Sequence, residues 1–157
     1  MDKVTKVFPV ISVCLLLLIC SPVYGIESYL KLVDGQKRQQ VPIELLREQA
    51  DVEFTIFAPF RGREIKMRGV LLETVLERYL SKVPDKIKLI AHDGYALTFE
   101  QWKKKHWVIV THEDGKVITI RQQGPLRLVE REYAGKDAKN LRNFNDWVWM
   151  LDTIEAM

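Results

Sequence analysis

Apolar and polar positions alternate in several short stretches of the chain. Alternation with a period of two is typical of half-buried β-strands, whereas helical spacing appears only briefly. We therefore predict an α+β fold, mixed and mainly β in its core, with a few short helices. The strands are expected at residues 29–33, 52–57, 65–70, 87–91, 95–99, 107–110, 116–120, 126–129 and 147–151.

Aspartate-glycine pairs mark the turns between these strands. Asp93-Gly94 separates two alternating stretches and predicts a hairpin. Asp114-Gly115 predicts a second strand pair, and Asp34-Gly35 ends the first strand.

Three short helices are predicted between the strands. Pro42 stands at a tolerated first-turn position and opens a helix over residues 43–46. Thr98 and Gln101 resemble a capping box, which predicts a short helix that carries Trp102. The longest helix is expected over residues 71–80, with an apolar face made of Leu71, Leu72, Val75, Leu76, Tyr79 and Leu80.

The C-terminal part of the chain predicts a polar loop and then a buried strand. Residues 133–142 are polar and are expected to form a surface loop. Residues 147–151 are apolar on both faces of a strand, which favours burial within a sheet or between layers. The tryptophans are interpreted as core residues rather than a sugar or nucleic-acid platform, and they are Trp102, Trp107, Trp147 and Trp149.

The N-terminal segment has the order of a secretory signal peptide. Lys3 and Lys6 precede an apolar run, which is followed by a polar break and a small residue at Gly25. The run is too short for a comfortable bilayer crossing, which takes about 20 residues, although an uncleaved anchor is the alternative. We therefore predict a signal peptide at residues 1–25, a single domain at residues 26–157, and a periplasmic or secreted location.

Cysteine usage excludes several enzyme classes. Both cysteines, Cys14 and Cys20, lie inside the predicted signal peptide. The exported chain would then have no thiol nucleophile, thiolate metal ligand or disulfide. The net charge of the whole chain is +3, so charge gives no reason to predict a nucleic-acid partner.

Five motifs follow one another in an order that resembles the oxidoreductase molybdopterin-binding domain, the sulfite-oxidase fold. The resemblance covers residues 29–156 and is strongest to small exported members of that family. The motifs are Phe57-Ala58-Pro59-Phe60, Gly69-Val70-Leu71-Leu72, His92-Asp93-Gly94-Tyr95, Gly124-Pro125-Leu126-Arg127-Leu128-Val129 and Trp147-Val148-Trp149.

This resemblance implies a mainly β core with a pterin site in a cleft lined by loops. Catalytic members ligate molybdenum through a cysteine on or just after the strand that corresponds to residues 52–57, where this chain has none. A hydroxyl such as that of Thr55 is a poor substitute for a soft sulfur ligand. Molybdopterin therefore stays a candidate cofactor by resemblance, while molybdenum is doubted and no catalytic or metal-binding residue is assigned.

Loop arginines are the candidates for binding an anion, because guanidinium groups pair with carboxylate and phosphate. Gly124 would allow backbone to approach a ligand, while His92 and Tyr95 belong to a hairpin tip that could form a cleft wall. The alternative is that these arginines are surface residues or pair with Glu130 and Glu132. The predicted ligand-binding residues are Arg61, His92, Tyr95, Arg121, Gly124, Arg127 and Arg142.

His106 and His112 are evenly spaced around a predicted strand and could face one side with Glu113. No tight metal-ligand spacing accompanies them. The leading hypothesis is a non-redox module that binds a small anionic ligand or a partner protein. Two alternatives stay open: a molybdopterin-dependent oxidoreductase without a cysteine ligand, and a sensing or interaction partner of a membrane signalling protein.

Overall fold

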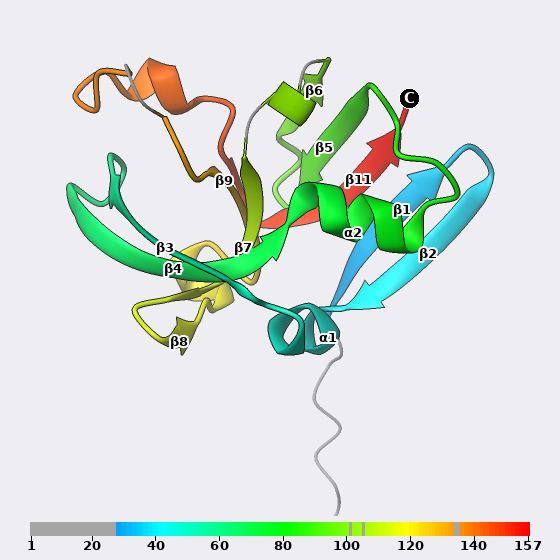
Figure 1. The fold of residues 1–157 in the computed structure, drawn as a ribbon, viewed down its shortest axis with the longest axis horizontal. Coiled ribbons are helices and arrows are strands. Elements are labelled where there is room, and N and C mark those ends of the chain that lie inside the picture. Colours follow the sequence, from blue (N-terminus) through cyan, green and yellow to red (C-terminus); the bar gives the residue numbers. More distant parts are fainter. Residues whose placement is uncertain (1–27, 101, 105, 134–135) are drawn as a thin grey trace, which may run out of the picture.

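Two β-sheets form the framework of the described part of the protein (Figure 1). The structure is a computed structural model that describes residues 28–100, 102–104, 106–133 and 136–157. The predicted signal peptide, residues 1–25, lies outside these residues. The mainly β character with a few short helices is confirmed.

The first sheet has the strand order β2-β1-β11-β5-β6. Its neighbours are antiparallel except for β1 and β11, which run parallel with Lys31 opposite Thr153. The strands are β1 (Tyr29–Asp34), β2 (Lys37–Pro42), β5 (Ile87–Ala91), β6 (Ala96–Phe99) and β11 (Leu151–Ala156).

The second sheet has the order β10-β9-β7-β4-β3, and β8 pairs with β7 beside this path. All of its pairings are antiparallel. The strands are β3 (Val52–Ala58), β4 (Arg63–Leu71), β7 (Trp107–Glu113), β8 (Lys116–Val117), β9 (Arg127–Glu130) and β10 (Val148–Trp149).

Two α-helices lie against these sheets. Helix α1 (Ile43–Glu48) follows β2 directly and contacts β2 of the first sheet and β4 and β7 of the second. Helix α2 (Leu72–Tyr79) follows β4 and packs on β4 and β7 through Leu72, Val75 and Leu76. The described residues also include three short 3-10 helices: η1 (Trp102–Lys104), η2 (Ile120–Gln122) and η3 (Leu141–Phe144).

Burial follows the predicted alternation on β5 and is continuous on β7. Ile87, Leu89 and Ala91 are buried on β5, whereas every residue of β7 from Trp107 to His112 is buried. Strand β7 lies between β9 and β4, so both of its edges are paired, and the burial of consecutive side chains shows that both of its faces are covered.

Gly69 allows β4 to approach β7. A Cβ at this position would lie 2.2 Å from the carbonyl oxygen of Ile109 and 2.8 Å from the Cα of Val110. The pairing register of the two strands shifts between Arg68 and Gly69, which places the glycine at this irregularity.

Both predicted aspartate-glycine hairpins are confirmed, as are the helices predicted over residues 43–46 and 71–80. The predicted helix that carries Trp102 is the 3-10 helix η1, while Thr98, its expected cap, lies in β6, and other elements also differ. Strand β2 was not predicted, because four of its six residues are exposed polar side chains at a sheet edge. The predicted strand over residues 116–120 stops at Val117, since Ile120 begins η2. The predicted polar loop over residues 133–142 contains the start of η3.

The prediction of a single strand over residues 147–151 is wrong. Met150 has a φ of 53°, and the backbone changes direction there between β10 of the second sheet and β11 of the first. The Met150 amide donates to Gln123 O at 3.2 Å, and its carbonyl accepts from His92 N at 2.9 Å. The apolar run therefore contributes one strand to each sheet, although its sequence resembles that of a single buried strand.

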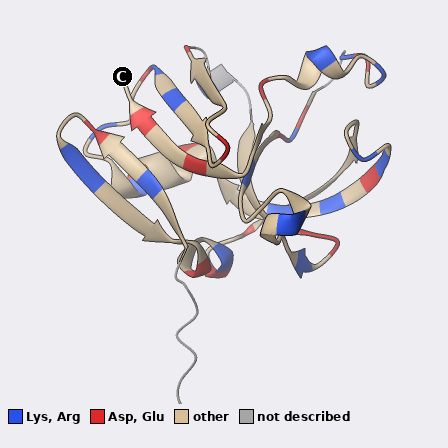
Figure 2. Cartoon of the chain, turned by 180° about the vertical axis from the view of Figure 1, so that it is seen from behind, with Lys and Arg blue, Asp and Glu red and all other residues tan. Residues whose placement is uncertain are grey.

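Charged residues are distributed over both sheets (Figure 2). Several basic positions pair with nearby carboxylates, as Lys66 does with Glu53 at 2.8 Å and Lys103 with Asp85 at 2.7 Å. Among the described residues, no helix is both long and apolar enough to span a membrane.

Candidate functional site

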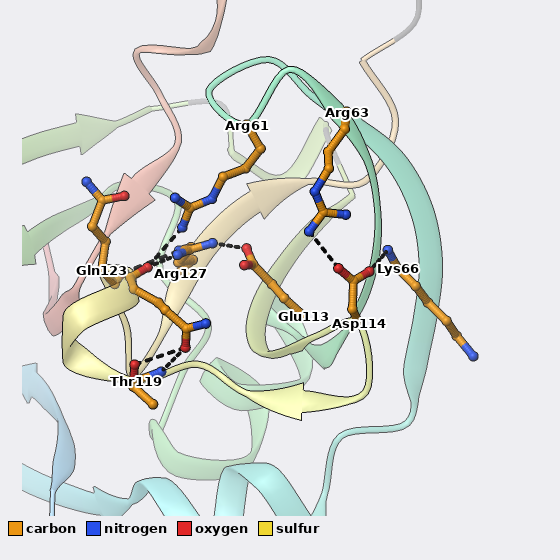
Figure 3. A network of polar contacts seen from close by, with 9 residues as sticks. Arg61, Arg63, Lys66, Glu113, Asp114, Thr119, Gln123 and Arg127 are labelled. Atoms are coloured by element: carbon orange, nitrogen blue, oxygen red, sulfur yellow. Dashed lines mark hydrogen bonds and ion pairs between the residues drawn. The ribbon is translucent and has the colours of Figure 1, made fainter.

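Arg127 on β9 is a fully buried arginine, with 0% of its surface exposed. Its guanidinium forms an ion pair with Glu113 at the end of β7 (Figure 3). It also donates to the carbonyl oxygens of Gln122 and Gln123, and it lies 4.3 Å from the ring centroid of Trp149. These partners come from three segments of the chain, so Arg127 joins β7, β9 and β10 to the turn after η2.

The charge of Arg127 persists at neutral pH. Burial lowers the pKa of Arg127 to about 9, and the positive charge of Arg61 acts in the same direction. The carboxylate of Glu113 opposes both effects, because an adjacent negative charge favours the protonated guanidinium. A ligand that contacted Arg127 would have to displace Glu113 or one of the two carbonyl groups.

Arg61 reaches the same turn from the tip between β3 and β4. Its side chain is exposed, donates to Gln122 O at 3.0 Å and lies 5.7 Å from the Trp149 ring centroid. Arg121 precedes Gln122 in η2 and is also exposed. The structure thus brings two predicted residues, Arg61 and Arg127, together at the Gln122 carbonyl oxygen, and a third, Arg121, directly precedes Gln122 in the sequence. We call Arg61, Arg121 and Arg127 the arginine cluster.

A second ion pair fixes the tip that carries Arg61. Gly62 adopts a φ of +67° in the turn, a conformation that glycine tolerates without steric cost. Arg63 then donates to Asp114 at 2.7 Å, and the Lys66 backbone N–H donates to the same carboxylate at 3.2 Å. These hydrogen bonds lower the pKa of Asp114 and connect the tip to the turn between β7 and β8 (Figure 3).

An open cleft with a volume of about 410 Å³ adjoins the arginine cluster. Phe60 precedes Arg61 on the β3-β4 tip, and Trp149 contacts both Arg61 and Arg127. Tyr95 donates its hydroxyl to Asn145 O at 2.8 Å. The residues that line this aromatic cleft are Phe60, Asp93, Tyr95, Phe144, Asn145, Trp147 and Trp149.

Several aromatic rings of the cleft meet at steep angles. Phe60 lies 5.3 Å from Trp149 with an interplanar angle of 87°, and Phe144 lies 5.3 Å from Trp147 at 78°. These edge-to-face pairs are a favoured geometry of aromatic packing. Trp147 is 3% exposed, and its buried Nε1 has no acceptor among the described residues.

His92 and Gly124 line a different cavity, of about 250 Å³, which we call the His92 cavity. Lys31 and Asp152 form an ion pair at 3.1 Å in its lining. Burial raises the pKa of Asp152, but hydrogen bonds from Thr153 and Lys31 outweigh that effect, so the net shift is downward.

Gly124 has a packing role in this structure. A Cβ on Gly124 would lie 2.6 Å from Ile118 Cγ2 and 2.8 Å from Ile118 O. Gly124 can therefore pack closely against Ile118, where a larger residue would clash. Gly124 also lines the His92 cavity, and its contact with a ligand stays a prediction.

The predicted site residues thus fall into three groups. The arginine cluster holds three of them, Tyr95 lines the aromatic cleft, and His92 and Gly124 line the His92 cavity. Arg142 is exposed in η3 and contributes to neither lining. Sequence analysis assigned Trp149 to the core, whereas it is half-buried and connects the arginines to the cleft. The only sign of this role in the sequence was that Trp149 follows another tryptophan, Trp147, by two residues.

The histidine pair does not form a metal site. His106 is exposed and lies 3.1 Å from Glu132, whereas His112 is buried and its Nε2 lies 2.9 Å from Arg68 Nη2. Burial and then the charge of Arg68 lower the pKa of His112. No group of three histidine, cysteine, aspartate or glutamate side chains suited to a metal occurs among the described residues.

The residues of β3 do not fit the molybdenum ligand that the resemblance implies. Thr55 is exposed on this edge strand, opposite Lys66 of β4, and offers a neutral hydroxyl in place of a thiolate. Cys14 and Cys20 lie outside the described residues. The donor chemistry here therefore supplies no soft ligand.

No protein-family model matches the chain, and no curated protein shows significant similarity to it. The resemblance to molybdopterin-binding domains accordingly stays a prediction.

Proposed function

We propose that the chain is an exported, non-redox binding module for a small anionic ligand. The observation that carries this proposal is that Arg61 and Arg127 meet at the Gln122 carbonyl oxygen, one residue after Arg121 and next to an aromatic cleft. Among the described residues, one carboxylate, that of Glu113, is paired with the arginine cluster. The cluster therefore keeps a positive charge that favours an anion.

The three arginines would contribute in different ways. Arg61 is exposed and donates one hydrogen bond to Gln122 O, so its remaining N–H groups can pair with a carboxylate or phosphate. Arg121 is exposed one residue before Gln122 and adds a second cation to that segment. Arg127 is enclosed and acts as a positioning residue, because it holds the turn and Trp149 against which Arg61 lies.

Anion titrations followed by tryptophan fluorescence test this function. Trp149 contacts Arg61, so an anion bound there is expected to change the emission of the full-length protein. Arg61→Ala should abolish the response, whereas the matched variant Arg142→Ala, an exposed arginine outside both cavity linings, should retain it. A response that survives Arg61→Ala, or no response to phosphate, sulfate and carboxylates, would refute the proposal.

We also propose that the domain is a sulfite-oxidase-type fold that has lost its redox centre. The ordered motifs support the fold type, and the neutral hydroxyl of Thr55 on β3, where catalytic members have a thiolate, supports the loss of the metal. Native mass spectrometry with elemental analysis tests this on protein purified from a molybdate-fed, cofactor-competent host. An apo mass is expected. A stoichiometric pterin mass with molybdenum would instead favour an oxidoreductase.

A further inference from the structure

We propose that the aromatic cleft binds the sugar ring of an anionic saccharide. This inference rests on the proposed anion-binding function, because it assigns the ligand's charged group to Arg61 and its ring to the neighbouring cleft. Phe60 and Trp149 connect the two places: Phe60 is adjacent to Arg61 in sequence, and Trp149 contacts both Arg61 and Phe60.

The angles between the aromatic rings favour a saturated ring over a flat one. Phe60 and Trp149 stand at 87°, and Phe144 and Trp147 stand at 78°. Neither pair therefore offers two parallel ring faces between which a planar base could stack. A pyranose instead presents C–H groups in several directions and can contact aromatic walls that meet at steep angles.

Polar groups of the cleft suit hydroxyls, which both donate and accept hydrogen bonds. The Nε1 of Trp147 is a buried donor without an acceptor among the described residues, and a ligand oxygen in the cleft could accept from it. Asp93 is an acceptor whose Oδ1 already receives the Tyr95 N–H at 3.1 Å. Asn145 lines the same cleft and supplies an amide.

Charge separates an anionic saccharide from an organic cation, the other ligand that aromatic cages bind. Trp149 already has the guanidinium groups of Arg127 and Arg61 at 4.3 Å and 5.7 Å from its ring centroid. A further cation would be repelled by both. An anionic substituent directed toward Arg61 would be attracted, while the sugar hydroxyls could reach Asp93.

Binding measurements with three probes test the inference on the full-length protein. We would titrate methyl β-glucuronide, methyl β-glucoside and inorganic phosphate and follow binding by calorimetry and NMR. The glucuronide is expected to bind at least 10-fold more tightly than either the neutral glucoside or phosphate, because it alone supplies both the ring and the charge.

Trp147→Phe tests the cleft itself, since it removes one N–H and keeps an aromatic ring. It should weaken glucuronide binding about 2- to 10-fold, the loss expected for one hydrogen bond, and leave phosphate binding unchanged. Trp102→Phe is the matched control: Trp102 is also 3% exposed, its buried Nε1 has no partner among the described residues, and it does not line this cleft. Circular dichroism establishes that both variants fold, and Asp93→Asn gives a second test of ring binding.

The outcomes separate this inference from the proposed function. Phosphate binding that depends on Arg61, with no preference for the glucuronide, would overturn the saccharide assignment and leave anion binding intact. Binding of neither phosphate nor glucuronide would overturn both. Glucuronide binding that Trp147→Phe and Asp93→Asn leave unchanged would place the sugar outside the aromatic cleft and also refute the inference.

Discussion

The ion pair between Arg127 and Glu113 should be among the largest single contributions to the stability of the second sheet. Glu113→Gln keeps the shape of the side chain and one hydrogen-bond acceptor but removes the negative charge. Arg127 is then left as a buried cation, because only 1% of its side chain is exposed. Its other partners in the structure, two carbonyl oxygens and the Trp149 ring, are uncharged.

The expected cost follows from this burial. Two opposite charges about 4 Å apart attract by about 4 kcal/mol at an effective dielectric constant of about 20. Removing one partner of a buried pair typically costs about 3–5 kcal/mol. We expect about 3 kcal/mol for Glu113→Gln, since the amide and the carbonyls still accept hydrogen bonds from Arg127. For a domain of this size, that loss corresponds to a fall in Tm of about 10 °C.

Urea unfolding followed by tryptophan fluorescence measures this loss. The matched control is Asp114→Asn at the next residue, which removes a charge from an exposed pair with Arg63. That pair has side chains 59% and 45% exposed, so its loss should cost less than about 1 kcal/mol. Equal costs for the two variants would refute the reasoning that burial decides the contribution of each pair.

Three further outcomes are expected. Lowering the pH from 7 to 5.5 should destabilise the protein, because burial and the charge of Arg68 lower the pKa of His112 in the folded state. The unfolded chain takes up this proton near pH 6.5, whereas the folded state takes it up only at lower pH, so protonation favours the unfolded chain. His112→Asn should flatten this dependence of the urea midpoint on pH. Gly69→Ala should cost about 3 kcal/mol in the same assay, because its Cβ meets the Ile109 carbonyl, and a loss below about 1 kcal/mol would contradict so close an approach of the two strands. Gly35→Asn, at a φ of +59° with open space around it, should cost less than about 1 kcal/mol.

Turns and helices that depend on residues close together in the sequence were predicted correctly. The Asp93-Gly94 and Asp114-Gly115 turns formed where expected, and α2 begins within one residue of its predicted start. Strand β2 escaped prediction because an edge strand can expose polar side chains on both faces. The junction at Met150 escaped because hydrophobicity does not encode the backbone direction.

The site was predictable in its residue types and only partly in its geometry. The sequence placed candidate arginines on either side of Gly124-Pro125, and in the structure Arg61 and Arg127 both donate to Gln122 O; that this is a binding site stays a prediction. Nothing in the sequence indicated that Arg127 is buried, because its partner Glu113 comes from a different strand. The aromatic cleft was missed for a similar reason: it combines segments far apart in the chain.

The change of direction at Met150 places consecutive residues in the walls of the aromatic cleft and of the His92 cavity. Trp147 and Trp149 line the aromatic cleft, while the next residues, Met150 to Asp152, line the His92 cavity. One short stretch of backbone is thus a wall of both. If occupancy of the aromatic cleft shifted that stretch, the shape of the His92 cavity would change, and the occupants of the two would be thermodynamically linked. Such a linkage is reciprocal: each occupant would change the affinity of the other by the same factor.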